Sequence, residues 1–318
     1  MEILQLLRLL ADGRFHSGEA LGAQLGISRS AVWKQLQQLE QDYGVCLQRI
    51  RGKGYRLEQP LSLLSAELLS QRLPRQRVLI EERVDSTNAL ALRQLGYLEP
   101  PYVVLAEAQS MGRGRRGRHW VSPYGTNLYF SQVIRIDRSS TQLQALSLVV
   151  GLVVLRTLRQ LGVREIGLKW PNDLLASGKK IAGILLELNG DPADICHVVI
   201  GIGINANMLH EEGIDQAWTS MQREIGRTVD RNELAIVLAE QLEQALTMHR
   251  EQGFAAFHQE WERYHLWQGR EVRLISGVHE VAGTALGVSG DGGLRLLVEG
   301  AEQVYSGGEL SLRLQHDS

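Results

Sequence analysis

Apolar residues recur at helical spacing at the start of the chain. They predict a first helix that ends at Asp12-Gly13 and a second helix from Gly18 to Leu25. After a turn at Gly26, Ser28 can cap a third helix. The inward face of that helix is an apolar stripe at i, i+4 and i+7, formed by Val32, Leu36 and Leu39. This spacing is typical of a helix-turn-helix.

Residues 45–57 predict two short strands around the turn 51–54, a hairpin with cations at its tip. We therefore expect a winged helix-turn-helix over residues 1–60. The third helix and the hairpin tip present groups that can reach base edges or phosphates in a major groove. The predicted DNA-binding residues are Ser28, Arg29, Ser30, Trp33, Lys34, Gln37, Arg51 and Lys53. A dimerisation or regulatory module with an ordinary solvated face is the alternative, and the placement of the cations favours DNA.

A larger domain is expected over residues 61–267, preceded by Pro60 and opened by a short helix that Ser65 caps. Apolar runs predict strands at 77–84, 102–108, 127–136, 166–170, 180–188 and 196–204, and helices at 87–95, 141–161, 232–251 and 254–263. Hairpin-length turns at 177–178 and 189–194 predict a mixed or mainly antiparallel sheet. Because regular βαβ alternation is missing, we predict α+β rather than a doubly wound nucleotide fold.

The last segment, residues 268–318, has short apolar runs separated by glycine turns. The runs lie at 271–275, 281–288, 294–299, 302–307 and 310–314. This pattern of short apolar runs and glycine turns predicts a small all-β barrel.

Composition limits the class of protein. A chain of 318 residues with 44% hydrophobic residues can form two or three domains and is not a disordered protein. The 34 basic residues are balanced by 36 acidic ones, so any contact with nucleic acid must come from a local patch. Cys46 and Cys196 lie far apart without a CxxC pairing, which argues against a disulfide framework or structural zinc. We expect a cytoplasmic protein without a membrane segment, since the most apolar run is about half a membrane span.

The segment Gly112–Arg118 packs four arginines and three glycines into seven residues. Glycines let the backbone approach a ligand closely, and guanidinium groups neutralise phosphate and carboxylate oxygens. An anionic small molecule is therefore the expected ligand. The alternatives are a flexible segment for single-stranded nucleic acid and a solvated loop. The position between apolar strands favours the ligand site.

Three further clusters lie at predicted strand ends. Residues 85–88 offer hydroxyls and an amide beside free helix N–H groups, which suits a polar, uncharged head group. Residues 169–173 add a cation and a carboxylate that can hold phosphate-bound magnesium. Residues 179–183 begin the next strand with two lysines. Taken singly, the first cluster is most often a helix cap and the last a solvated turn.

Taken in order, these segments resemble the biotin-protein ligase family. The motifs are DSTN (85–88), GRGRRGRHW (112–120), SPYGTNLY (122–129), KWPND (169–173), KKIAGILLE (179–187) and GIGIN (201–205). With the winged helix, the resemblance is to bifunctional members that also repress a biotin operon, and it covers nearly the whole chain. It implies a class II synthetase-like ligase domain and an SH3-like C-terminal barrel.

The resemblance also implies an activity. Biotin and ATP form biotinyl-5′-adenylate with Mg²⁺, and the biotinyl group passes to a lysine of an acceptor such as the acetyl-CoA carboxylase carrier subunit. Implied partners are this biotin carboxyl carrier protein, biotin operator DNA and a second copy of the chain when adenylate is bound. Like charges in the arginine loop repel one another, so we expect ligand binding to order the loop.

Site residues follow from the matching motif positions. The implied biotin-binding residues are Ser86, Thr87, Asn88, Gln109, Gly112, Arg113, Gly114, Arg115, Lys180 and Gly183. The implied ATP-binding residues are Arg113, Arg115, Arg118, Trp120, Lys169, Asn172, Asp173, Lys180 and Asn205. Catalysis is assigned to Lys180, Arg115, Lys169 and Asp173, with Asp173 also the expected magnesium ligand.

Several alternatives stay open. A non-enzymatic biotin-sensing repressor would use the same pocket, and a lipoate-protein ligase relative would share the fold. The pair Gly201 and Gly203 lacks the third glycine and the helix of a dinucleotide fingerprint. The segment 206–218 is either a cover over adenine or a surface insertion.

Overall fold

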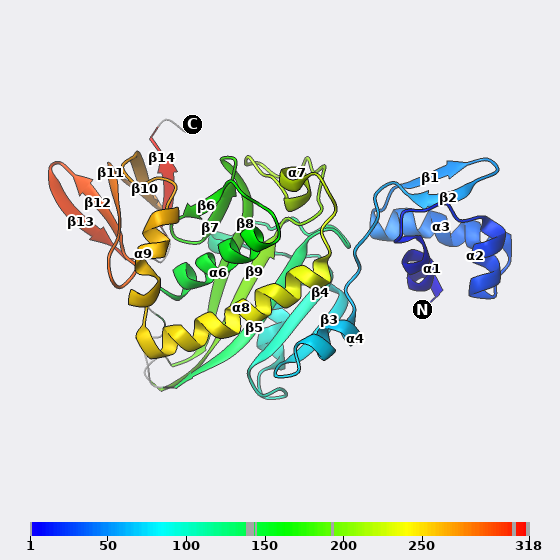
Figure 1. Ribbon diagram of the computed structural model, residues 1–318, viewed down its shortest axis with the longest axis horizontal. Helices are drawn as coiled ribbons and strands as arrows, with labels where there is room; N and C mark the ends of the chain where they lie inside the picture. The colour runs from blue at the N-terminus through cyan, green and yellow to red at the C-terminus, as the bar shows by residue number, and fades with distance from the viewer. Residues whose placement is uncertain (1, 138–142, 144, 192–193, 307–309, 316–318) are drawn as a thin grey trace.

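The computed structural model describes residues 2–137, 143, 145–191, 194–306 and 310–315. Three sheets of two, seven and five strands follow one another along the chain. The two-stranded sheet and its helices lie at one end of the molecule, and the five-stranded sheet lies at the other (Figure 1). The seven-stranded sheet lies between them.

The N-terminal unit is a winged helix-turn-helix, as predicted. Its elements are α1 (Glu2–Leu10), α2 (Gly18–Leu25), α3 (Arg29–Tyr43), β1 (Leu47–Ile50) and β2 (Gly54–Leu57). Ser28 caps α3 by accepting a hydrogen bond from the Ala31 N–H at 3.2 Å. The predicted stripe of Val32, Leu36 and Leu39 is fully buried. The antiparallel pair β1–β2 forms the wing.

The central unit is a mixed sheet with helices on both faces. Its strands are β3 (Arg77–Val84), β4 (Tyr102–Gln109), β5 (Leu128–Asp137), β6 (Ile166–Lys169), β7 (Asp173–Ala176), β8 (Lys179–Gly190) and β9 (Ile195–Ile204). Its helices are α4 (Ala66–Arg72), α5 (Thr87–Gln94), α6 (Leu146–Gln160), α7 (Met221–Ile225), α8 (Arg231–Gln252) and α9 (Ala255–Tyr264). The strand order is β3-β4-β5-β9-β8-β7-β6, in which β3 and β4 are parallel and the other neighbours antiparallel. The predicted mixed sheet is confirmed.

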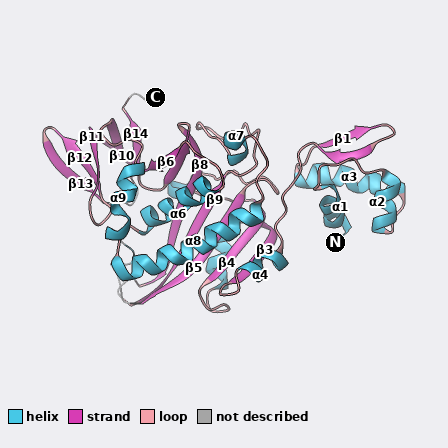
Figure 2. Ribbon diagram, in the orientation of Figure 1, coloured by secondary structure: helices cyan, strands magenta, loops and turns pink. Residues whose placement is uncertain are grey.

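Strand β4 shows why a continuous apolar run forms this strand. Val103 and Leu105 join the core that includes α6 and α8, while Tyr102 and Val104 join a second core beside α5. Alternate side chains of a strand point to opposite faces, so a strand covered on both faces is apolar throughout. Helices α6 and α8 cover the face of the sheet that Figure 2 presents. Packing on both faces thereby fixes the position of β4 in the sheet.

The C-terminal unit is an SH3-like antiparallel sheet of β10 (Glu271–Ser276), β11 (His279–Val288), β12 (Leu294–Val298), β13 (Ala301–Tyr305) and β14 (Ser311–Leu314). The strand order is β13-β12-β11-β10-β14. Inward residues such as Val272, Leu296 and Leu312 extend the core of the central unit. Positions 141, 142 and 144 of the predicted helix and 307 of the predicted strand lie outside the described residues.

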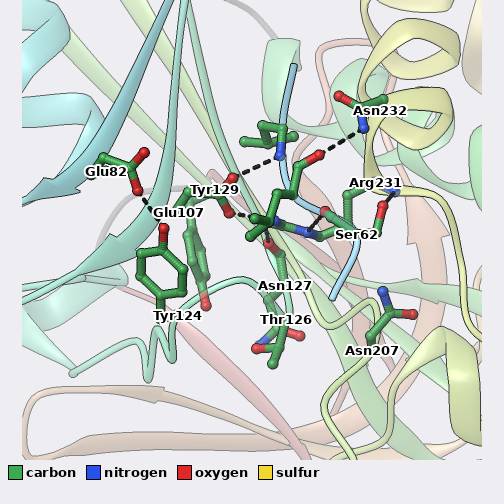
Figure 3. A network of polar contacts seen from close by, with 12 residues as sticks. Ser62, Glu82, Glu107, Tyr124, Thr126, Asn127, Tyr129, Asn207, Arg231 and Asn232 are labelled. Carbon is green, nitrogen blue, oxygen red and sulfur yellow. Dashed lines mark hydrogen bonds and ion pairs between the residues drawn. The ribbon is translucent and has the colours of Figure 1, made fainter. Parts of the chain in front are cut away.

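The linker between the winged helix and the central sheet is fastened at the start of α8. The Arg231 guanidinium donates to Ser62 O (2.8 Å) and Asn127 O (2.9 Å) and pairs with the Glu107 carboxylate, which also accepts from the Leu64 N–H at 2.7 Å (Figure 3). Arg231 is 0% exposed. A buried charge requires such complete hydrogen bonding. The linker therefore has a defined path.

Within the described ranges, no helix has the length and apolar character needed to cross a bilayer.

Candidate active site

A pocket of about 510 Å³ opens where strand ends and loops of the central unit meet. This volume is within the range of small-molecule sites. Predicted site residues that line it are Ser86, Thr87, Asn88, Gln109, Arg113, Gly114, Arg115, Arg118, Trp120, Lys169, Asn172, Asp173, Lys180, Gly183 and Asn205. Gly112 does not line the pocket. Gly112 is buried and packs closely on its surroundings, since a Cβ there would be 2.4 Å from Trp120 O.

The start of α5 supplies neutral polar groups. The Thr87 N–H and hydroxyl both donate to Gln109 Oε1, at 2.8 and 3.2 Å. Ser86 has the extended backbone of an N-cap residue, but its side chain makes no capping hydrogen bond. Its hydroxyl is therefore not used by the helix, contrary to the simple capping alternative. This end of the pocket suits an uncharged, hydrogen-bonding head group.

The arginine loop, residues 112–118, is fastened at both ends. The Trp120 N–H donates to Gly112 O and the Gly114 N–H donates to Arg118 O, each at 2.8 Å. Arg113 donates to Glu187 Oε1 at 2.8 Å, and Arg115 donates to Asn172 Oδ1 at 2.9 Å. Arg116, with φ 59°, makes the tight turn. The loop thus carries guanidinium groups across the pocket to β8 and to the β6–β7 turn.

Two lysines and an aspartate form the charged part of the pocket. Lys180 Nζ lies 2.8 Å from Asp173 Oδ1 and 5.4 Å from the centroid of the Trp120 ring system. Partial burial lowers the pKa of Lys169; Asp173 opposes this shift, while Lys180, Arg313 and Arg118 add to it. Cations outnumber carboxylates here, so the pocket favours an anionic ligand.

The glycines of the GIGIN segment make room for pocket side chains. A Cβ at Gly201 would be 2.4 Å from Asn88 Oδ1, and one at Gly203 would be 2.5 Å from the Trp120 indole. Such distances exclude any side chain at either position. The segment runs along β9, in the middle of an antiparallel region, so its glycines are explained by close packing rather than by a dinucleotide fingerprint.

Some residues that line the pocket lie outside the sequence motifs. Gly213–Gln216 and Trp218 line the pocket from the segment after β9, and Leu310–Arg313 line it from the C-terminal unit. The Lys180 N–H donates to Ala217 O, and the Thr219 N–H donates to Lys180 O, both at 3.0 Å. The second half of the 206–218 segment therefore pairs with the start of β8 beside the site.

The predicted magnesium site depends on a single carboxylate, that of Asp173. Across the described ranges, no group of three or more His, Cys, Asp or Glu side chains could hold a metal ion. Asp173 and the neighbouring amide of Asn172 could contribute oxygen ligands to an ion that is already bound to phosphate.

The predicted DNA-binding residues are all exposed. Ser28, Arg29, Ser30, Trp33, Lys34 and Gln37 lie at the start and outer face of α3, and Arg51 and Lys53 lie at the tip of the wing. Trp33 is a large apolar side chain with 48% exposure. The arrangement leaves these groups accessible to a partner.

Similarity to known proteins extends over nearly the whole chain. Residues 80–205 match the biotin/lipoate A/B protein ligase family, and residues 2–56 match an HTH domain. The bifunctional ligase/repressor BirA of Salmonella typhimurium is 42% identical over 312 residues, which cover 98% of this chain and 97% of that protein. The chain belongs to the BirA family of bifunctional ligase/repressors. BirA of Escherichia coli has the same identity and coverage.

Solved structures of related enzymes share the ligase part of this BirA family chain. The biotin protein ligase from Aquifex aeolicus, in complex with biotin and ATP, has a TM-score of 0.67 and 32% identity. The match covers 75% of this chain and 99% of that one.

Proposed function

We propose that the chain is an ATP-dependent biotin-[carboxyl carrier protein] ligase that also represses a biotin operon. The observation that carries the ligase proposal is the pocket itself, which joins the neutral hydrogen-bonding start of α5 to a cluster of cations from the arginine loop, β6 and β8. Two ligands together fit this division: one with an uncharged ring at one end and a carboxylate at the other, and a triphosphate that lies beside this carboxylate. Biotin and ATP are such a pair.

The reaction has two steps with balanced leaving groups. A biotin carboxylate oxygen attacks the α-phosphorus of ATP, forming the acyl-adenylate and releasing pyrophosphate. The amine of an acceptor lysine then attacks the acyl carbon, forming an amide and releasing AMP. Both steps place negative charge on phosphate or acyl oxygens, which prepositioned cations stabilise without reorganisation.

Individual roles follow from position. Ser86, Thr87 and Gln109 would hold the biotin ring, Arg113 and Arg115 would close over its carboxylate and the α-phosphate, and Lys180 would bridge the two. The remaining proposed contacts to biotin or nucleotide are Asn88, Gly112, Gly114, Gly183, Arg118, Trp120, Lys169, Asn172, Asp173 and Asn205. Asp173 would hold a Mg²⁺ that neutralises the phosphates. Lys180 is paired with Asp173 at 2.8 Å, so this pair would separate as the phosphates enter.

The ligase proposal is tested by biotin-dependent release of pyrophosphate, followed by labelling of a carrier-domain lysine. K180Q should lower kcat by about 10²- to 10³-fold, as expected when one group that stabilises developing charge is lost. K179Q is the matched control, because Lys179 is exposed, adjacent in sequence and outside the pocket lining. Turnover with lipoate instead of biotin would select the lipoate ligase alternative. Binding of biotin without any turnover would select the non-enzymatic sensor.

For the repressor activity, we propose that the adenylate acts as corepressor. Ordering of the arginine loop and of the 206–218 segment would favour a homodimer, which places two winged helices on a two-fold symmetric operator. Such a protein would act in the cytoplasm, where it meets both operator DNA and its carrier protein. The proposed division of the chain is 1–60 for DNA binding, 61–267 for ligation and 268–318 for the C-terminal unit.

Reversing two charges tests the DNA surface. K34E/R51E should abolish operator binding in the presence of biotin and ATP, because it places two carboxylates against phosphates. The control R227E/R250E reverses two exposed arginines outside the winged helix. Mobility-shift titrations at one salt concentration compare the variants. Operator affinity equal to that of the parent in K34E/R51E would refute the assignment, while pyrophosphate release should be the same in all three proteins.

A further inference from the structure

A carboxylate lies beside the arginine loop of a pocket otherwise built for an anion. Glu187, on β8, accepts from Arg113 Nη2 at 2.8 Å through one oxygen and from Asn88 Nδ2 at 2.7 Å through the other. Arg113 belongs to the loop after β4, and Asn88 belongs to the first turn of α5. One side chain therefore joins two elements that carry proposed biotin contacts.

The contact between Glu187 and Asn88 is made by an amide that is held in place by its own buried surroundings. Asn88 is 3% exposed, and its Oδ1 accepts from Ser131 Oγ at 2.6 Å. The backbone of Gly201 packs so close that a Cβ there would be 2.4 Å from the same oxygen. With Asn88 held on these sides, the amide fixes the Glu187 carboxylate in one orientation. The second carboxylate oxygen is then directed at the loop.

The contact with Arg113 is the exposed half. The Arg113 side chain is 43% exposed, compared with 25% for Glu187, and it projects from a loop that contains three other arginines. Like charges so close in sequence repel one another. A carboxylate held by the core offsets one of these charges and draws the loop toward β8. A partly exposed pair of this kind has a modest effect, so it can hold the loop and still let it open.

We infer that Glu187 is a positioning residue that anchors the arginine loop through Arg113. The inference rests on the proposed function for the identity of the ligand, but the anchor itself is a property of the chain. Holding the loop against β8 before the ligand arrives reduces the conformational entropy lost on binding. Loss of the anchor should therefore raise KM for biotin more than it lowers kcat.

The test uses E187Q in the full-length chain. Glutamine keeps the length of the side chain and an acceptor for Asn88, but it removes the charge that attracts Arg113. The matched control is E260Q, since Glu260 pairs with Arg156 at similar exposure on helices α9 and α6, outside the pocket lining. Trypsin cleavage after Arg116 and Arg118, both exposed, reports loop opening without any ligand. Initial cleavage rates at these two bonds are read by mass spectrometry.

E187Q should be cleaved about two- to fivefold faster than the parent and E260Q, the change expected for one partly exposed ion pair. R113Q removes the same contact from the other side and should give the same increase, which also covers the case in which E187Q folds poorly. In the R113Q background, E187Q should add nothing. KM for biotin should rise by a similar factor in E187Q, with kcat changed by less than twofold.

Equal cleavage of E187Q and E260Q would overturn the inference, as would an effect of E187Q that persists in the R113Q background. The proposed function fails separately, if the parent chain releases no pyrophosphate with biotin. The cleavage rates decide the role of Glu187 in either case.

Discussion

His265 is a buried histidine whose two imidazole nitrogens have no hydrogen-bond partner among the described residues. It follows α9, is 6% exposed, and packs on Trp261 with ring centroids 4.8 Å apart. Burial lowers its pKa from 6.5 to about 4. Desolvation disfavours the imidazolium, and within the described part of the chain no carboxylate offsets this effect. The residue therefore makes the stability of the fold depend on pH.

The direction of the pH dependence follows from linkage. Below pH 6.5 the unfolded chain binds a proton at His265, whereas the folded chain stays neutral there until about pH 4. Stability is thus fully present above pH 6.5 and is lost between these values, by about 2 kcal/mol at pH 5. H265F keeps a ring against Trp261 and removes the titration. Thermal unfolding at pH 7.5 and 5.0 should show a smaller fall in Tm for H265F, and equal falls would contradict this account.

At the scale of elements, the length of each apolar pattern decided what could be predicted. Strand β3 and helices α2 and α5 lie within one residue of the predicted ranges, because their patterns are bounded by glycine or by capping residues. Strand β7 was not among the predicted strands. It has only four residues, Asp173–Ala176. A run this short shows no alternation of apolar and polar side chains before the turn to β8. Helix α7, with five residues, is also too short to show a helical pattern.

The candidate site was predictable only where a motif lies at a strand end. The arginine loop and residues 169–173 and 179–183 meet because β4, β6 and β8 bring their ends together. Leu310–Arg313 reach the pocket from a separate sheet, and only the charge of Arg313 could have drawn attention to them. Likewise, Glu187 lies in a motif but near the far end of its strand, seven residues after Lys180. Only the tertiary structure places its carboxylate beside Arg113.

At the scale of the molecule, one buried ion pair holds the linker that follows the winged helix against the central unit. Arg231 and Glu107 hold linker residues 62 and 64, and Glu107 lies two residues before Gln109 on β4. Arg231 also donates to Asn127 O, and the Asn127 side chain accepts from the Ala206 N–H at 3.0 Å, at the start of the 206–218 segment. The residues that hold the linker are therefore neighbours, in the chain or through a hydrogen bond, of two segments that line the pocket elsewhere, β4 and 206–218.

Removing the cation of this pair should destabilise the chain and loosen the linker together. R231M leaves Glu107 buried and unpaired, which should cost about 3–5 kcal/mol. R231M/E107Q removes that uncompensated charge and should recover part of the loss. R75M, which breaks the exposed pair Arg75–Glu243, is the control and should change stability by about 0.5 kcal/mol or less. Thermal unfolding ranks the variants, and the rate of proteolysis within residues 59–65 reports the linker. If R231M matches R75M in both measurements, the buried pair does not fix the linker, and the winged helix must be positioned by its other contacts, such as Tyr43 against Tyr124.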